Sequence, residues 1–225
     1  PAVPGVEGYD VTGKILRPAL TRDLPPLRGR GITNQDNRNI YLARIDGKVE
    51  MKDNSIDIQP LHEIHGDVDM IIGKVEFFGD IMITGNVEAG VVIRAGRNVI
   101  INGFVEAVQI FAGGDVVLKR GVSGGKKAKV IAKGSVMADF IENAEIDATG
   151  SVHANIILNS RVFSKDTVYV TGKKGTIIGG ITHGLTGLSA MNLGNDVEVK
   201  TIIHVGFEPG SYERFVYLTR KESEL

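Results

Sequence analysis

Cysteine and tryptophan are absent from the 225-residue sequence, and phenylalanine and tyrosine supply only 8 and 5 residues. Without a thiol, the chain has no disulfide, no thiolate zinc site, no iron–sulfur cluster and no cysteine nucleophile. Neither sign of charge is in excess, since 26 Lys and Arg oppose 27 Asp and Glu. A net charge of −1 provides no general field that would gather nucleic acid or anionic lipid, so we expect no nucleic-acid partner.

Long hydrophobic runs are also missing. No stretch approaches the ~20 apolar residues that span a bilayer, and residues 1–5 do not resemble a signal peptide. We therefore expect a soluble chain with no membrane span. Because the sequence opens on Pro1 and reaches Leu225 within a charged pattern, we also expect it to be a piece of a longer protein.

Glycine, by contrast, is abundant, with 29 residues against only 7 prolines. This share is well above the ~7% average, and without an excess of proline or serine it favours tight corners over flexible linkers. Since 42% of the residues are hydrophobic, the chain can bury a sizeable core.

Apolar or small residues recur in a unit of four positions. The second position, which is small or apolar, lies two residues after the first, the third lies four residues after the second, and the fourth lies two residues after the third. The copies are Val75, Phe77, Ile81 and Ile83; Ile93, Ala95, Val99 and Ile101; Ile110, Ala112, Val116 and Leu118; Val130, Ala132, Val136 and Ala138; Ile146, Ala148, Val152 and Ala154; Val162, Ser164, Val168 and Val170; and Met191, Leu193, Val197 and Val199. From Ile81 to Val168 the third positions follow one another at 18, 17, 20, 16 and 16 residues. Alternation with period 2 inside each half predicts short strands with one face turned inward.

Strands this short are unstable alone, so they must stack as rungs of a β-solenoid, each pairing with the rungs before and after it. Corner residues agree with this, because Gly and a small polar residue precede most third positions, as in Gly79-Asp80 and Gly134-Ser135. Turns of this length allow three faces. An additional apolar position marks the third face, at Val87, Val105 and Leu158.

We expect insertions to gather at one corner of the solenoid, notably in residues 121–128 and 172–180. A sandwich or barrel of short strands is the alternative fold, because it too has glycine-rich turns every 8–12 residues or so. A small residue that recurs once per turn favours the solenoid, since a stacked column explains it. The residues are Ala95, Ala112, Ala132 and Ala148.

The flanks of the repeat are expected to cap its open ends. Residues 1–62 should form a small N-terminal β domain, with strands at 40–43 and 48–51. The solenoid should extend over residues 63–206. After it, residues 207–225 should begin a truncated C-terminal helical region, since apolar residues there have helical spacing.

Five short motifs carry a resemblance to a known family. They are Pro4-Gly5-x-x-Gly8-x-x-Val11-x-Gly13; Asp46-Gly47-Lys48-Val49; Gly66-Asp67-Val68-Asp69; Phe140-Ile141-Glu142-Asn143-Ala144; and Gly172-Lys173-Lys174-Gly175-x-Ile177-x-Gly179-Gly180. Together they resemble the FapA family, the bacterial flagellar assembly protein A domain family, over nearly the whole sequence. Residues 181–193 depart from the family pattern, because the stretch 182–187 interrupts the repeat.

The resemblance implies an all-β fold: a right-handed, three-faced β-solenoid with a small N-terminal β domain and a short C-terminal helix. It also implies likeness to the solenoid domain of the division inhibitor MinC and to the polymer-forming bactofilins, none of them known as an enzyme class. The family name implies a cytoplasmic role in flagellar assembly or cell-pole organisation. We therefore expect a non-enzymatic scaffold that binds protein partners and self-associates through a flat solenoid face.

A solenoid enzyme is the alternative function. Four neighbouring carboxylates would suit acid–base cleavage of a polysaccharide, namely Asp139, Glu142, Glu145 and Asp147. Their positions flank inward residues and should face solvent. The six-residue spacing from Ile81 to Val105 also resembles that of acyltransferase solenoids, for which His183 is the one candidate catalytic histidine.

Two further motifs carry no chemistry. The pair His62-x-x-His65 has no further ligand cluster after it, and Gly8-x-x-x-x-Gly13-Lys14 has Ile15 where a phosphate-binding loop needs Ser or Thr. We expect no catalytic residue, no metal and no cofactor.

The strongest local signal is a pair of basic glycine loops that break the third face. They hold Lys126, Lys127, Lys173 and Lys174. Solvated turn lysines are the simpler interpretation, and a patch for an anion or an acidic partner is the alternative. The repeat places the loops about three rungs, or roughly 14 Å, apart along the axis, so on a shared corner they would form one basic edge.

Overall fold

The structure is a computed structural model that describes residues 3, 5–18, 20, 25–35, 40–53, 55–207, 211 and 221. The chain divides into two compact units, Pro1–Gln59 and Pro60–Leu225. No helix among the described residues is long and apolar enough to cross a membrane. The C-terminal helix expected within residues 207–225 lies outside the described residues, because beyond Phe207 only two isolated positions are described.

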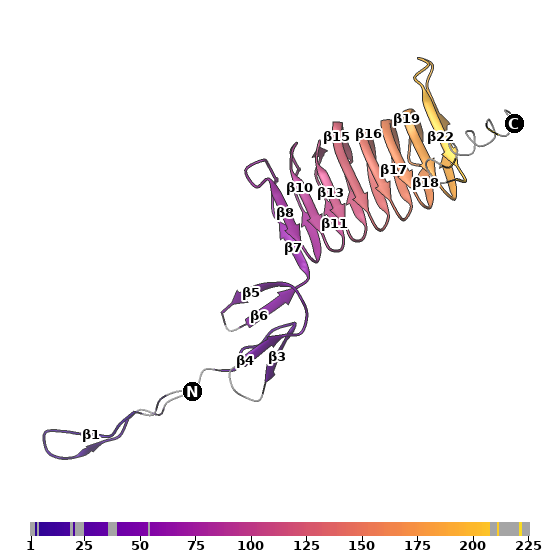
Figure 1. The fold of residues 1–225 in the computed structure, drawn as a ribbon. Helices are drawn as coiled ribbons and strands as arrows, with labels where there is room; N and C mark the ends of the chain where they lie inside the picture. The colour runs from indigo at the N-terminus through magenta and orange to yellow at the C-terminus, as the bar shows by residue number, and fades with distance from the viewer. Residues whose placement is uncertain are drawn as a thin grey trace. The chain divides into compact units, whose positions relative to one another are not determined.

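The first unit consists of antiparallel hairpins over its described residues (Figure 1). The pairs are β1 (Gly8–Tyr9) with β2 (Ile15–Leu16), β3 (Ile32–Gln35) with β4 (Ile40–Ala43), and β5 (Lys48–Lys52) with β6 (Ser55–Gln59). The strands expected at 40–43 and 48–51 are therefore confirmed. In the first hairpin the Asp10 carboxylate accepts hydrogen bonds from the backbone N–H groups of Thr12 and Lys14, both at 2.8 Å, so the nearby glycines belong to a turn.

Over its described residues, the second unit is one sheet of sixteen strands, all paired in parallel (Figure 1). The strands are β7 (Leu61–Ile64), β8 (Lys74–Phe77), β9 (Asp80–Ile83), β10 (Val92–Ala95), β11 (Val99–Ile101), β12 (Val105–Glu106), β13 (Gln109–Ala112), β14 (Val116–Leu118), β15 (Val122–Ala132), β16 (Val136–Ala148), β17 (Val152–Ser164), β18 (Thr167–Val170), β19 (Thr176–Gly184), β20 (Gly187–Ala190), β21 (Asn192–Leu193) and β22 (Thr201–Val205). Each strand pairs with the equivalent strand of a neighbouring turn, and most strands of the inner turns have such a partner on both sides. The expected β-solenoid is confirmed.

Each turn has three faces, which we number by their ladders of paired strands. Face 1 runs from β8 through β10 and β13 to β22, and face 2 runs from β7 through β9, β11 and β14 to β18 and β20. Face 3 begins at Val68, which pairs with Val87 and through it with Val105 of β12. The long strands β15, β16, β17 and β19 bend around corners and contribute to two or three faces each.

The inward column predicted for face 2 is confirmed. Its members are in register on successive rungs, and none has any exposed surface: Ile81, Val99, Val116, Val136, Val152 and Val168. Neighbouring members are therefore separated by the strand spacing of about 4.8 Å. Because parallel strands in register place equivalent residues of successive turns on top of one another, one apolar residue per turn at this position is enough to build a continuous dry column.

The corner between faces 1 and 2 is held by a column of small polar residues, which we call the polar ladder. Its members are Asp80, Asn98, Asp115, Ser135 and Ser151. Asp80 Oδ1 accepts the Asn98 N–H at 3.0 Å, Asn98 Oδ1 accepts the Asp115 N–H at 2.8 Å, and Asp115 Oδ1 accepts the Ser135 N–H at 2.8 Å. The side chains of Asp80, Asn98 and Asp115 thus satisfy the turning backbone of the next rung, which is why Asp and Asn accompany the corner glycines.

The last turns differ from the sequence-based prediction. Thr182 pairs with Val162, and Leu188 pairs with Val168, so the repeat continues through the stretch where an interruption was expected. The inward position of this rung is occupied by a polar residue, Thr182, so the hydrophobic pattern of the sequence does not reveal the rung. The copy expected at 191–199 is wrong, because all four of its apolar residues are exposed.

Face 3 was predicted correctly at its start and wrongly further along. Val87 and Val105 are each 1% exposed and lie inward, as expected. At the later rung the inward residue is Ile157, which pairs with Ile141 and is fully buried, whereas Leu158 is half-buried and faces outward. Two adjacent apolar residues leave a period-2 pattern ambiguous, and only the register decides between them.

Replacing Thr182 by Val should stabilise the solenoid. The Thr182 hydroxyl is fully buried and has no hydrogen-bond partner, and the side chain lies between Val162 and Ile203 in the face 1 core. Since a buried unsatisfied hydroxyl costs about 1–3 kcal/mol and Val has nearly the same shape, we expect a gain of about 1 kcal/mol in the free energy of unfolding. Urea titration followed by circular dichroism measures it, and a lower midpoint would contradict this placement.

Candidate partner-binding surface

The first basic loop leaves the solenoid within β15. Ser123 pairs with Glu142, and Ala128 pairs with Ala144. Between these two pairs the chain advances five residues on β15 but only two on β16, so three extra residues of β15 protrude. The loop lies at the corner between faces 3 and 1. Lys127 is exposed there, whereas only the backbone of Lys126 is described.

The second basic loop lies between β18 and β19. Val170 pairs with Ala154 and Thr176 with Ile156, so six positions oppose two and four extra residues protrude at the corner between faces 2 and 3. Lys173 and Lys174 are both exposed. The Lys174 backbone is held on both sides: its N–H donates to Asn155 Oδ1 at 3.0 Å, and its carbonyl oxygen accepts from the Thr176 hydroxyl at 2.8 Å.

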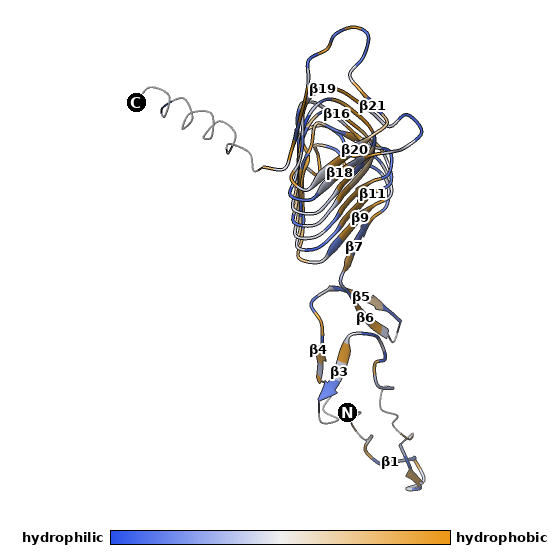
Figure 2. Ribbon diagram, turned by 90° about the vertical axis from the view of Figure 1, so that its right-hand side faces the viewer, coloured by the Kyte–Doolittle hydropathy of each residue, from blue (hydrophilic) through white to orange (hydrophobic). Residues whose placement is uncertain are grey.

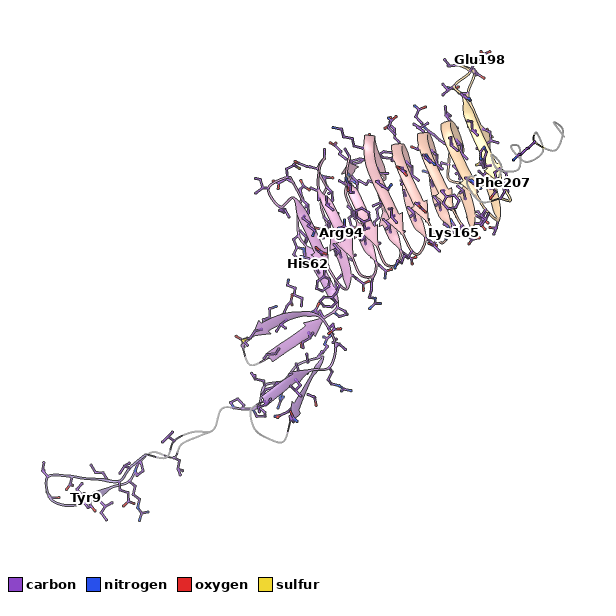
Figure 3. The ribbon with its side chains drawn as sticks, viewed as in Figure 1. Tyr9, His62, Arg94, Lys165, Glu198 and Phe207 are labelled. Carbon is purple, nitrogen blue, oxygen red and sulfur yellow. The ribbon has the colours of Figure 1, made fainter. Side chains whose placement is uncertain are left out.

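The two loops therefore occupy different corners, on opposite sides of face 3. The expectation that insertions gather at one corner is wrong, so the condition for a single basic edge of four lysines is not met. The repeat spacing shows how many residues are inserted but not at which corner. The corner between faces 3 and 1 carries a further excursion instead, the segment between β21 and β22 that includes Glu198 (Figure 3).

The four carboxylates considered for polysaccharide cleavage do not converge. Asp139 lies at the corner between faces 2 and 3, where Asn155 donates to it at 3.4 Å, and Glu142 lies on face 3 with Ser123 at 3.3 Å. Glu145 and Asp147 project from face 1, with Glu145 Oε1 3.3 Å from the Lys129 ammonium. A pair of acids acting on one glycosidic bond must face each other across it, and these four point from three surfaces.

Four of the five histidines, all except His65, have rings close to another ring. His183 is 4% exposed on face 1, and its ring lies 5.3 Å from Phe163 and 5.2 Å from Phe207, which Figure 3 shows beside the last turn. It belongs to the regular strand β19 and not to an excursion loop. His62 is in register with Ile81 at the first rung. Across the part of the chain that the structure describes, no group of three or more His, Asp and Glu side chains is arranged to hold a metal ion.

Face 2 presents an outward column without Lys, Arg, Asp or Glu, which we call the apolar stripe. It follows the inward column of the same strands by one residue, on six successive turns: Met82, Ile100, Val117, Met137, His153 and Tyr169. Met137 and Tyr169 are 53% and 38% exposed, and the others are half-buried by one another. The rings of His153 and Tyr169 stack at 4.8 Å with an interplanar angle of 16°. Figure 2 shows the face 2 strands β7, β9 and β11 one above another.

The column beside the apolar stripe is the polar ladder, whose polar groups already have partners inside the chain. Its Ser135 and Ser151 hydroxyls lie 3.3 Å apart, and the Ser151 hydroxyl is 3.0 Å from His153 Nε2. Such groups lose fewer hydrogen bonds to water on being covered than unpaired ones would, although the carboxylates of Asp80 and Asp115 each have only one oxygen bonded within the described part of the chain. Face 2 therefore combines a regular outward column with a column of partly paired polar groups.

The other two faces lack this combination. On face 1 the outward columns are interrupted by charged residues, among them Arg94 and Asp147, and Arg94 lies over the Phe111 ring at 4.2 Å. On face 3 the rings of Phe104 and Phe140 approach to 6.3 Å beside a column that contains Glu142, and both basic loops interrupt that face. Over the described residues, face 2 is thus the most regular of the three faces and the one with the fewest charged side chains in its outward columns.

Two family models match the chain, and between them they cover nearly all of it. The Flagellar Assembly Protein A beta solenoid domain matches residues 60–225, and the Flagellar Assembly Protein A N-terminal region matches residues 1–54. The chain belongs to the Flagellar Assembly Protein A family. No curated protein and no solved structure matches it closely enough to show a further relationship. The resemblance carried by the five sequence motifs is confirmed.

The inward residues of the repeat do not predict the apolar stripe of this family member, which lies on the outward side of the same strands. A signal was present: the residue between the third and fourth inward positions of each repeat should be polar on a solvated sheet, yet it is apolar or aromatic on most turns. The basic loops can be recognised in the sequence because they interrupt the repeat, whereas the stripe residues follow the repeat without interruption.

Proposed function

We propose that this chain is a non-enzymatic, cytoplasmic scaffold of flagellar assembly, and that it binds protein through the apolar stripe of face 2. Membership of the Flagellar Assembly Protein A family supports the role in flagellar assembly. The observation that carries the binding role is the apolar stripe, which has no Lys, Arg, Asp or Glu over six successive rungs. A contiguous apolar surface of this kind marks interaction sites on proteins that otherwise keep such residues scattered.

The parallel ladders explain why a solenoid suits this role. The backbone of every rung is fixed by the rungs on both sides, so the stripe side chains keep one spacing and one direction before a partner arrives. Association then orders few groups, and less of the interaction energy is lost as conformational entropy. The alternative of a solenoid enzyme has less support, because its carboxylates are dispersed over three surfaces and its histidine is covered by Phe207.

Replacing Met137 by Asp should abolish this function while leaving the fold intact. Met137 is 53% exposed, so its substitution affects the surface, and a carboxylate in the middle of the stripe would lose its hydration when a partner covers it. In a flagellated strain deleted for its own copy, we expect the variant to fail to restore swimming and flagellar number.

The matched control is Met191→Asp, the same change at a residue that is 65% exposed and lies outside the stripe. It should restore swimming like the unmodified chain. Both variants should show unmodified circular dichroism and thermal unfolding. Full restoration of swimming by Met137→Asp would refute the proposed binding role.

The basic loops are a second proposed contact, for an acidic protein surface. Because the loops lie on different corners, their charges can be reversed separately, Lys126 and Lys127 to Glu in one variant and Lys173 and Lys174 to Glu in another. Each should leave stability within about 0.5 kcal/mol and weaken binding at low salt, with the difference vanishing as screening sets in at about 10 Å in 0.1 M salt. The amount of partner that the immobilised chain retains at increasing salt measures this. If both variants retain as much partner as the unmodified chain at low salt, the lysines are ordinary solvated turn residues.

A further inference from the structure

We infer that the occupant of the apolar stripe is a second copy of this chain, packed face 2 against face 2 with the two solenoids antiparallel. The inference rests on the proposed function, because it names the partner of the same stripe. It is carried by the symmetry of face 2, by the charges at its centre and by its uniform rung spacing.

A face can pack against its own copy about a twofold axis that lies in the interface, and two directions of that axis matter. An axis along the solenoid exchanges the two columns, so the apolar stripe of one copy would lie against the polar ladder of the other. An axis along the strands instead maps each column onto itself and reverses the order of the turns. Only this antiparallel arrangement covers both columns while placing apolar on apolar and polar on polar.

The charges at the centre agree with the antiparallel arrangement. If the six turns are numbered from Met82 to Tyr169, turn 3 of one copy meets turn 4 of the other, and Val117 packs against Met137. In the same contact Asp115, on the polar ladder of turn 3, faces the exposed Lys133 at the corner of turn 4, and the twofold axis makes this pair twice. Opposite charges meet at the centre, which favours this register over one shifted by a rung.

The size of the face predicts how strong the dimer is. Six strands at about 4.8 Å span ~24 Å, and a four-residue strand is ~13 Å long. The contact therefore buries roughly 600 Å² in total, below the range of stable interfaces, so we expect a weak, reversible dimer with a dissociation constant on the order of 10 µM or weaker.

The absence of cysteine from the chain gives a direct test of orientation. Two variants, Met82→Cys and Tyr169→Cys, are distinguished by a mass tag, mixed at high concentration and treated with a short bismaleimide. In the antiparallel dimer turn 1 meets turn 6, so we expect mixed crosslinks between the two variants and few crosslinks within either one. A parallel dimer would bring each introduced thiol to its own copy and produce the reverse pattern, which overturns the inference.

Sedimentation equilibrium on the full chain tests the dimer itself. We expect a concentration-dependent rise from monomer to dimer mass for the unmodified chain and for Met191→Asp, and at least a tenfold weaker association for Met137→Asp. A chain that stays monomeric at several hundred micromolar overturns the inference. If Met137→Asp still abolishes swimming in that case, the scaffold function stands with a different partner. If instead the unmodified chain dimerises, Met137→Asp stays monomeric and cells that carry Met137→Asp swim normally, the dimer stands and the proposed function is refuted.

Discussion

Replacing Val136 by Asp should unfold most of the solenoid. Val136 has no exposed surface and lies between Val116 and Val152 in the face 2 core, where no cation and no water can reach a carboxylate. The group must either stay charged without a partner or take up a proton and remain unpaired. We expect a loss of more than about 4 kcal/mol in the free energy of unfolding, which is a large part of the stability of an ordinary domain.

The matched control for this prediction is the next residue along the chain. Met137→Asp introduces the same group on the outward side of the same strand, at a side chain that is 53% exposed. It should change the free energy of unfolding by about 0.5 kcal/mol or less. Urea titration followed by circular dichroism compares the two variants, and equal midpoints would show that the assigned alternation of inward and outward residues is wrong.

The middle of the solenoid could be predicted from the sequence because one strong signal repeats there. Between Ile81 and Val168 an inward Val or Ile returns on every turn, and small alanines accompany it on face 1. Parallel stacking places identical positions above one another, so a sequence repeat translates directly into a spatial column. Six rungs in register left no freedom to shift one of them.

The last turns could not be predicted in the same way, because their inward residues are not apolar. Thr182 continues the column of Val162, and Gly184 continues that of Ser164, but neither would be recognised as a core residue by its chemistry. The backbone ladder fixes the rung regardless of the side chains. A hydrophobic pattern therefore misses a rung that hydrogen bonds to the previous turn are sufficient to form.

The candidate site was harder to predict than the fold for a geometric reason. Which corner a loop occupies depends on where each inserted residue falls relative to the register, and the sequence gives only the total length of a turn. For the loop with Lys127 the extra residues follow face 3, and for the loop with Lys173 they precede it. A difference of a few positions moved the lysines to opposite sides of the face.

The glycine-rich stretch before β19 and within it leads to the second large prediction, that Gly180→Ala should destabilise the final turns. Gly180 has φ of +77°, a left-handed conformation that costs an L-residue about 1–2 kcal/mol. A Cβ there would also lie 2.2 Å from the carbonyl oxygen of Ser160, on the neighbouring rung. That oxygen belongs to the backbone of the paired strand β17, so relieving the clash means opening the ladder.

We therefore expect Gly180→Ala to lower the free energy of unfolding of the final turns by about 3 kcal/mol or more. The matched change Gly187→Ala should be nearly neutral, because a Cβ at Gly187 would meet Thr167 at an ordinary 3.4 Å. Each rung contacts only its neighbours, so the loss should be confined to the turns beyond β17. Hydrogen exchange should show faster exchange in β19 and β22 of the Gly180→Ala chain, with the amides of β9 and β11 still protected. Uniform acceleration across all turns would mean that the solenoid unfolds as one cooperative unit, and equal protection in both variants would show that the left-handed corner at Gly180 is misplaced.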